Sequence, residues 1–123
     1  MECHYDSPTA GYQAMNAVAR LADPPTCVLM PDDHTCLGAL KAAADLGLRV
    51  PEDISIGGYD GISLSQLILP RLTTIRQDTQ SIGAQAARLL IDRIENSRTA
   101  VSETVSVPVK LLPGESIGPV KRG

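Results

Sequence analysis

Apolar positions in the first third of the chain recur with two different spacings. Over Pro8–Ala22 they follow the helical period, and a serine before the opening proline is typical of a capped helix start. Residues Thr26–Met30 form a short, continuous apolar run, the pattern of a strand buried on both faces. Helical spacing returns at Leu37 and stops at Gly47, a residue suited to a left-handed helix end. This region therefore predicts a helix, a strand and a second helix.

The rest of the chain predicts two further strands, a long helix and a late strand. Ile54–Tyr59 and Leu72–Arg76 are β-prone segments, and Asp78 is placed to cap a long helix after them. Residues 103–112 are typical of a late strand, whose middle Pro108 restricts to a sheet edge or a crossover. The long helix is expected to run from about Thr79 to Asn96, with an apolar stripe of Ile82, Ala86, Leu89, Leu90 and Ile94. Strands that alternate with helices predict an α/β fold with a parallel sheet.

Composition limits the classes of function. At 123 residues the chain holds one domain or less, and without Phe or Trp its core has to be mainly aliphatic. The net charge of −3 and the scattered basic residues exclude a basic patch that would hold DNA by itself. The sequence has no apolar run long enough for a membrane span and no signal-peptide pattern, so we expect a cytoplasmic protein without membrane contact.

The cysteines give no sign of a metal or redox centre. The three of them lack paired spacing, and Cys27 lies in an apolar run where we expect it to be buried and inert. Cys3 and His4 are adjacent residues near a terminus, and two such ligands do not make a tetrahedral set. We therefore expect no metal and no cofactor.

Polar side chains follow each of the three predicted strands. Asp32 and Asp33 come after the first strand, Asp60 after the second, and Gln77 with Asp78 after the third. In open parallel sheets, ligands bind beyond the carboxyl ends of the strands, so these residues are predicted to share one rim. Carboxylates accept charge-assisted hydrogen bonds from hydroxyl and N–H groups, which suits a polar small molecule.

Structural roles compete with this interpretation. Asp33 and Asp78 directly precede helices, and N-capping alone accounts for an acid at such a position. Asp60 before a glycine is also a common turn pattern, whereas Asp32 has no equally simple structural role. Polar strand ends are frequent in α/β proteins, so the pattern alone leaves both interpretations open.

Ordered motifs over most of the chain connect it to a known family. The segments LGALKAAADLGLRVPEDISIGGYD and LPRLTTIRQD resemble the LacI/GalR family of bacterial transcriptional regulators, with its GLxVPxDIS, GYD and PxLTT pieces. The resemblance implies a periplasmic-binding-protein-like type I fold with an effector held between two lobes. It also implies a non-enzymatic, ligand-sensing role in transcription regulation, with operator DNA bound through a helix-turn-helix that this chain does not show.

The resemblance also implies roles for the strand-end residues. Asp32 and Asp33 match the Asn-Asp pair of the family, one position of which contacts the effector, while Asp60 matches the GYD aspartate and Gln77 a glutamine near the ligand. Asp32 departs from the family, because it replaces an amide with a negative charge. Neutral polyols or cationic groups should therefore suit this rim better than phosphorylated or carboxylated effectors. Gly114 stands where the family usually has an arginine, so no role transfers to it.

Domain boundaries and pairing surfaces follow from the same resemblance. Residues 8–77 are expected to form part of the C-terminal lobe, residues 78–107 to belong to the N-terminal lobe, and residues 108–123 to be a return segment and tail. The upstream arginine and the aromatic residue that contact effectors in the family are not seen in this sequence. A homodimer is expected through the predicted helix and the apolar segment that contain Leu37, Leu67, Ile68 and Leu69.

Other functions fit the sequence less well. A solute-binding protein of a sugar transporter shares the implied fold and is the main alternative, but its sequences seldom carry VPEDIS with PxLTT. A phosphoacceptor receiver domain has its phosphorylated aspartate two strands after the acidic pair, whereas Asp60 ends the very next strand. A glycosidase needs an acid and a base across a cleft, and no other motif supports one.

Overall fold

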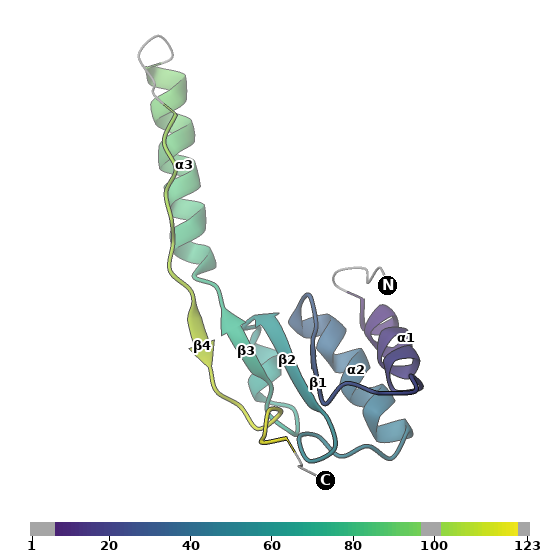
Figure 1. Ribbon diagram of the computed structural model, residues 1–123. Coiled ribbons are helices and arrows are strands. Elements are labelled where there is room, and N and C mark those ends of the chain that lie inside the picture. The colour runs from purple at the N-terminus through teal and green to yellow at the C-terminus, as the bar shows by residue number, and fades with distance from the viewer. Residues whose placement is uncertain (1–6, 97–101, 121–123) are drawn as a thin grey trace. The chain divides into compact units, whose positions relative to one another are not determined.

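The computed structural model describes residues 7–96 and 102–120 (Figure 1). Contacts divide the chain into two compact units, one that includes the described residues up to Arg76 and from Leu111 onward, and one from Gln77 to Lys110. The elements are α1 (Pro8–Val18), β1 (Cys27–Leu29), α2 (Asp33–Asp45), β2 (Ser55–Asp60), the 3-10 helix η1 (Ser63–Gln66), β3 (Thr73–Arg76), α3 (Thr79–Glu95) and β4 (Lys110–Leu112).

A sheet with the strand order β1-β2-β3-β4 is the frame of the first unit. β1 pairs with β2, and β2 with β3, both in parallel, with Val28 opposite Ile56 and Gly58 opposite Thr74. Helix α2 is the crossover between the first two strands, as the alternation of apolar patterns predicts. The predicted α/β class with a parallel sheet is therefore confirmed.

Helix α2 packs against β2, and helix α1 packs against α2 (Figure 1). Gly38 of α2 allows their close approach, because a Cβ atom there would lie only 1.7 Å from the backbone oxygen of Pro8. The core beneath them is made of small and medium-sized side chains: Met15, Met30, Cys36, Ala39, Ala42, Ala43, Ile54, Ile56 and Leu72. Alanines on α2 let the helix lie close to the strands, so a core without Phe or Trp still packs.

Several predicted boundaries are corrected by the structure. Helix α1 ends at Val18 and not at Ala22, and the late strand predicted over residues 103–112 is reduced to Lys110–Leu112. Pro108 explains the shorter strand, because proline has no N–H to donate to a sheet ladder. The predicted burial of the first strand is also wrong. β1 lies at the edge of the sheet, and both Cys27 and Leu29 are exposed.

The second unit consists of α3 and the extended segment that leads into β4. Asp78 caps α3 by accepting a hydrogen bond from the Ser81 amide at 3.0 Å, as the sequence predicts. Arg88 forms an ion pair with Glu103 at 3.1 Å. No residue of α3 is buried, and the apolar stripe is exposed at Leu90 and Ile94. Among the helices in the described parts of the chain, none has the length and apolar character to cross a membrane.

Candidate functional site

Asp32 lies at the carboxyl end of β1 and has a structural role that the sequence did not predict. Its backbone is extended, and it is the N-cap of α2. Oδ1 accepts from the Thr35 amide at 2.7 Å, and Oδ2 accepts from the Thr35 hydroxyl at 3.0 Å. Only 4% of the residue is exposed. The expectations that Asp33 caps this helix and that Asp32 has no simple structural role were therefore wrong, because the first helical residue is Asp33 and the cap is one position earlier.

Asp33 is fully buried and connects three segments of the first unit. Oδ1 accepts a hydrogen bond from the Thr74 hydroxyl on β3 at 2.6 Å, and Oδ2 accepts one from the Ile62 amide after β2 at 2.9 Å. Burial raises the pKa of this carboxyl above its usual value, although the bonds from Thr74, Ile62 and the Gly61 amide partly oppose the rise. The nearby charge of Asp60 raises the pKa further.

Asp60 ends β2 and enters a tight turn. Its φ angle is +107°, and that of Gly61 is +70°, so both residues lie in the region that favours glycine. Gly61 fits because a Cβ atom there would lie 2.6 Å from the Cβ of Arg76, the residue paired with Asp60 on β3. Asp60 is partly exposed, unlike Asp32 and Asp33. Of the three acids, it is the one that is partly exposed to solvent.

The structure thus brings Asp32, Asp33 and Asp60 to the carboxyl edge of the sheet of the first unit, the side at which its parallel strands end, as the sequence predicts. Gln77 is partly buried and begins the second unit. Sequence reasoning missed Thr74 and the Ile62 amide as partners of this edge, because both are far from Asp33 along the chain. In the parts of the chain that the structure describes, no group of three or more His, Cys, Asp or Glu side chains is arranged to hold a metal ion.

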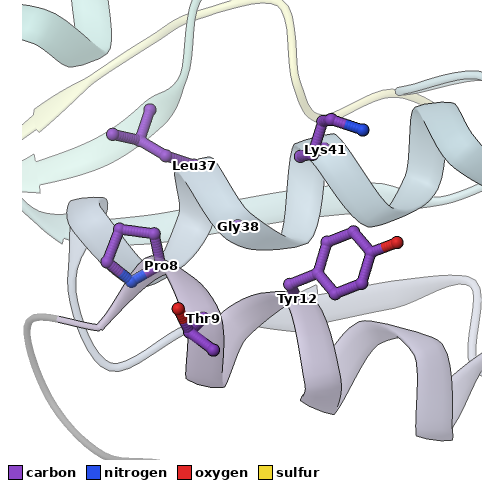
Figure 2. Close-up of a pocket in the computed structure, with 6 residues that line it drawn as sticks. All are labelled: Pro8, Thr9, Tyr12, Leu37, Gly38 and Lys41. Atoms are coloured by element: carbon purple, nitrogen blue, oxygen red, sulfur yellow. The ribbon is translucent and has the colours of Figure 1, made fainter.

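A groove runs between α1 and α2 on the side of the first unit that carries Leu37. Figure 2 shows its lining, and the groove has a volume of about 440 Å³. Leu37 and Lys41 line it from α2 and Tyr12 from α1, together with Pro8, Thr9 and Gly38. The lining is mainly apolar, which is a property of surfaces that pair with another protein surface.

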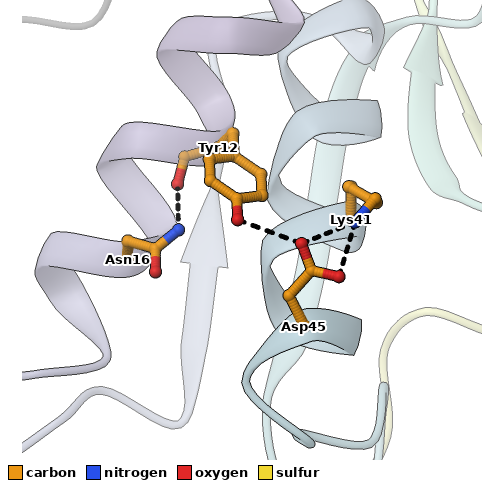
Figure 3. A network of polar contacts seen from close by, with 4 residues as sticks. All are labelled: Tyr12, Asn16, Lys41 and Asp45. Carbon is orange, nitrogen blue, oxygen red and sulfur yellow. Dashed lines mark hydrogen bonds and ion pairs between the residues drawn. The ribbon is translucent and has the colours of Figure 1, made fainter.

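A polar network connects the two helices beside this groove (Figure 3). The Tyr12 hydroxyl donates to Asp45 Oδ2 at 3.0 Å, and Lys41 Nζ donates to both oxygens of the same carboxylate. The bonds from Lys41 and Tyr12 hold the pKa of Asp45 below its usual value. Sequence reasoning missed this network. The spacing of Lys41 and Asp45 by four residues was its one local signal, since Tyr12 is 33 positions away.

The apolar segment at residues 67–69, which follows the Asp60 turn, contains both exposed and partly buried residues. Leu67 is 79% exposed and Leu69 88% exposed, whereas Ile68 is partly buried and packs against the core. The three residues predicted together for a pairing surface therefore divide, with Leu67 and Leu69 facing outward and Ile68 inward.

Comparison with known proteins assigns the chain to a class. A family model for the periplasmic binding protein-like domain matches residues 2–117. Because the match covers nearly the whole chain, the protein belongs to the periplasmic binding protein-like domain family.

Individual relatives narrow this class. The chain is 39% identical over 110 residues to the HTH-type transcriptional repressor PurR of Salmonella typhi, which is 89% of this chain and 32% of the repressor. The structure matches a LacI family transcriptional regulator from Enterococcus faecalis with bound ribose, with a TM-score of 0.86, 32% identity, and coverage of 98% of this chain and 44% of that one. It also matches the dimeric Lac repressor, with a TM-score of 0.83, 31% identity, and coverage of 94% of this chain and 42% of that one.

These similarities identify the chain as part of the effector-binding domain of a LacI/GalR-type regulator, as the motifs imply. The chain spans about a third of the length of the curated relatives it matches, 32% in each case. The relatives are transcriptional repressors and not transport proteins, so the alternative of a transporter's solute-binding protein is not favoured.

Proposed function

We propose that this chain senses a small, neutral, sugar-like effector for a DNA-binding transcriptional regulator. The observation that carries the proposal is the partly exposed Asp60, held in a tight turn at the carboxyl end of β2 beside two buried acids. Ligands of open parallel sheets bind at this end of the strands. A carboxylate there accepts hydrogen bonds from two neighbouring hydroxyls of a polyol.

The charge of this edge favours a neutral effector over an anionic one. The carboxyl edge of the sheet carries three acids, Asp32, Asp33 and Asp60. The burial of the first two strengthens the electrostatic field that an approaching charge would meet. The Enterococcus faecalis regulator of similar fold holds ribose, a neutral sugar. We therefore propose Asp60 as the direct contact with a sugar hydroxyl. We also retain Gln77, Asp32 and Asp33 as members of the binding region.

We propose that the effector acts by changing the closure of two lobes. Residues 8–77 would belong to the C-terminal lobe, residues 78–107 to the N-terminal lobe, and residues 108–123 to a return segment and tail. The division of the chain into units near Gln77 and Lys110 supports this proposal. The chain's own residues hold no catalytic role in it, and operator binding is assigned to a helix-turn-helix of the whole regulator.

Pairing of two copies is the second part of the proposal. The exposed leucines Leu67 and Leu69, and the groove beside Leu37, offer apolar surface of the kind that two-fold interfaces use. The Lac repressor of similar fold is described as dimeric. We propose a cytoplasmic homodimer that pairs through these residues.

Replacement of Asp60 tests the site. With D-ribose as the probe, Asp60→Ala in the intact regulator should weaken binding roughly tenfold to a hundredfold, the cost of about 1–3 kcal/mol for one lost hydrogen bond to a charged group. Titration calorimetry measures the change. Asp23→Ala, which removes an exposed acid outside this edge, is the matched control and should leave the affinity unchanged. Equal affinity of the Asp60 variant and the wild type would remove Asp60 from the site.

A further inference from the structure

We propose that Asp33 is a positioning residue, whose buried carboxylate fixes the turn after β2 and thereby sets where Asp60 presents its own carboxylate. Gly58 is the residue that leaves room for it. The inference rests on the proposed function in one respect, which is that Asp60 contacts the effector. It assigns Asp33 a role that differs from direct contact with a ligand.

The hydrogen bonds of Asp33 connect different parts of the first unit. One carboxylate oxygen accepts from the Thr74 hydroxyl at 2.6 Å, and the other accepts from the Ile62 amide at 2.9 Å. Thr74 is fixed in β3, and Asp33 is fixed at the first turn of α2. The Ile62 amide, two residues after Asp60, is therefore tied to two regular elements through one side chain.

The turn at Asp60 has a backbone conformation that surrounding contacts must hold. Asp60 at a φ of +107° is a non-glycine residue in a sparsely populated backbone region, and such residues persist where surrounding contacts hold them. The tie at Ile62 supplies a contact of this kind on the far side of the turn, and β2 pairing supplies one on the near side. The charge of Asp60 also raises the pKa of the Asp33 carboxyl, although less than burial does.

Gly58 supports the role of Asp33 independently, because it leaves the space that the Asp33 carboxylate occupies. A Cβ atom at this position would lie 2.3 Å from Asp33 Oδ1 and 3.0 Å from the Cys36 sulfur. Gly58 is also paired with Thr74 on the neighbouring strand β3. A side chain here would therefore push the Asp33 carboxylate away from Thr74. The second glycine of the Gly57-Gly58 pair is thus explained by the acid that occupies the space above it.

Amide hydrogen exchange of the 123-residue chain tests the tie without any ligand. The readout is the protection of the Ile62 amide relative to that of Ile56, whose amide donates to the Ser116 carbonyl in the same unit. We expect Asp33→Ala and Gly58→Ala each to lower this ratio about tenfold or more, because the acceptor is lost or displaced. Asp33→Asn should keep it within about threefold, since its amide oxygen still accepts from Ile62. An unchanged ratio in both alanine variants would overturn the proposal.

A double-mutant cycle on ribose affinity tests whether Asp33 acts through Asp60. Asp33→Ala should weaken ribose binding about tenfold in the wild-type background and cause little further loss in the Asp60→Ala background. Independent, additive losses would show that Asp33 acts by another route and would contradict the proposal. If the wild type failed to bind ribose, the proposed sugar specificity would fall, while the Ile62-to-Ile56 ratio would still decide the role of Asp33.

Discussion

Helices α2 and α3 are both capped by an aspartate and both carry an apolar stripe, but their surroundings differ. Seven residues of α2 are buried, and its start is tied to other strands and turns through Asp33. No residue of α3 is buried, and Leu90 and Ile94 on its stripe are 61% and 69% exposed. Contacts within this chain therefore hold α2 in place. The stripe of α3 has the apolar composition of a packed helix face, but its residues are not buried.

Alanine substitution of one glycine in each helix should give the largest contrast. Gly38→Ala places a Cβ atom 1.7 Å from the Pro8 carbonyl oxygen, and should lower the free energy of unfolding by roughly 3 kcal/mol because α1 must shift. Gly83→Ala meets no atom within 4 Å and should instead raise helix stability by up to about 1 kcal/mol. Urea unfolding measures both changes. Equal effects of the two substitutions would contradict the difference in packing.

A second pair of substitutions applies the same contrast to the segment after the Asp60 turn. Ile68→Glu should lower the free energy of unfolding by about 2 kcal/mol, because Ile68 packs against the core. Leu67→Glu should change it by less than about 0.5 kcal/mol, since Leu67 is 79% exposed.

Sedimentation velocity then reports on the proposed pairing. Leu67→Glu together with Leu69→Glu should shift the intact regulator from dimer toward monomer, because both side chains face outward. The same double variant sedimenting as the wild-type dimer would remove this surface from the interface.

The pH dependence of stability should differ between the wild type and Asp33→Asn by a smaller amount. The pKa of Asp33 in the folded chain lies above its ordinary value of 3.8, mainly because of burial. The groups that face it are the Thr74 hydroxyl, the amides of Gly61 and Ile62, and the Asp60 carboxylate. The nearby Cys36 thiol stays neutral, because burial also raises its pKa.

The direction in which stability changes with pH follows from proton linkage. The folded state binds more protons than the unfolded state between 3.8 and the raised pKa, so the wild type loses stability as pH rises through that window. Compared with Asp33→Asn, the wild type should therefore gain stability as the pH falls from about 7 to about 4. Urea titrations at several pH values measure this difference. A wild type that loses stability relative to the variant on acidification would mean that the hydrogen bonds outweigh burial.

Local sequence signals predicted most helices and strands of this fold, although not all of their ends, because the causes of those elements are local. A serine before Pro8 caps α1, Asp78 caps α3, and Gly47 takes the left-handed conformation after α2. The helix predicted between the first two strands was enough for the parallel pairing of β1 and β2, whereas no crossover helix is predicted between β2 and β3. The burial of β1 could not be predicted in this way, because it depends on whether another strand covers its outer edge, and β1 is an edge strand of the described sheet.

The candidate site was predictable as a set of positions but not as a set of contacts. Adjacent acids after a strand indicate a polar strand end, but which of them caps the helix depends on backbone angles, and here it is Asp32. The burial of Asp33 depends on Thr74, 41 positions away, and on the missing side chain at Gly58. Such long-range contacts leave no periodic signal in a single sequence.

The central claim is that Asp60 and the two buried acids form an edge that senses a neutral polyol. Calorimetric titration of the intact regulator with D-ribose and with ribose 5-phosphate tests it most directly, because the two ligands share a sugar and differ in charge. Burial of Asp32 and Asp33 beside Asp60 predicts that ribose binds at least about tenfold more tightly, since an added phosphate would meet like charge in a low-dielectric surrounding. Tighter binding of the phosphorylated sugar would contradict the account.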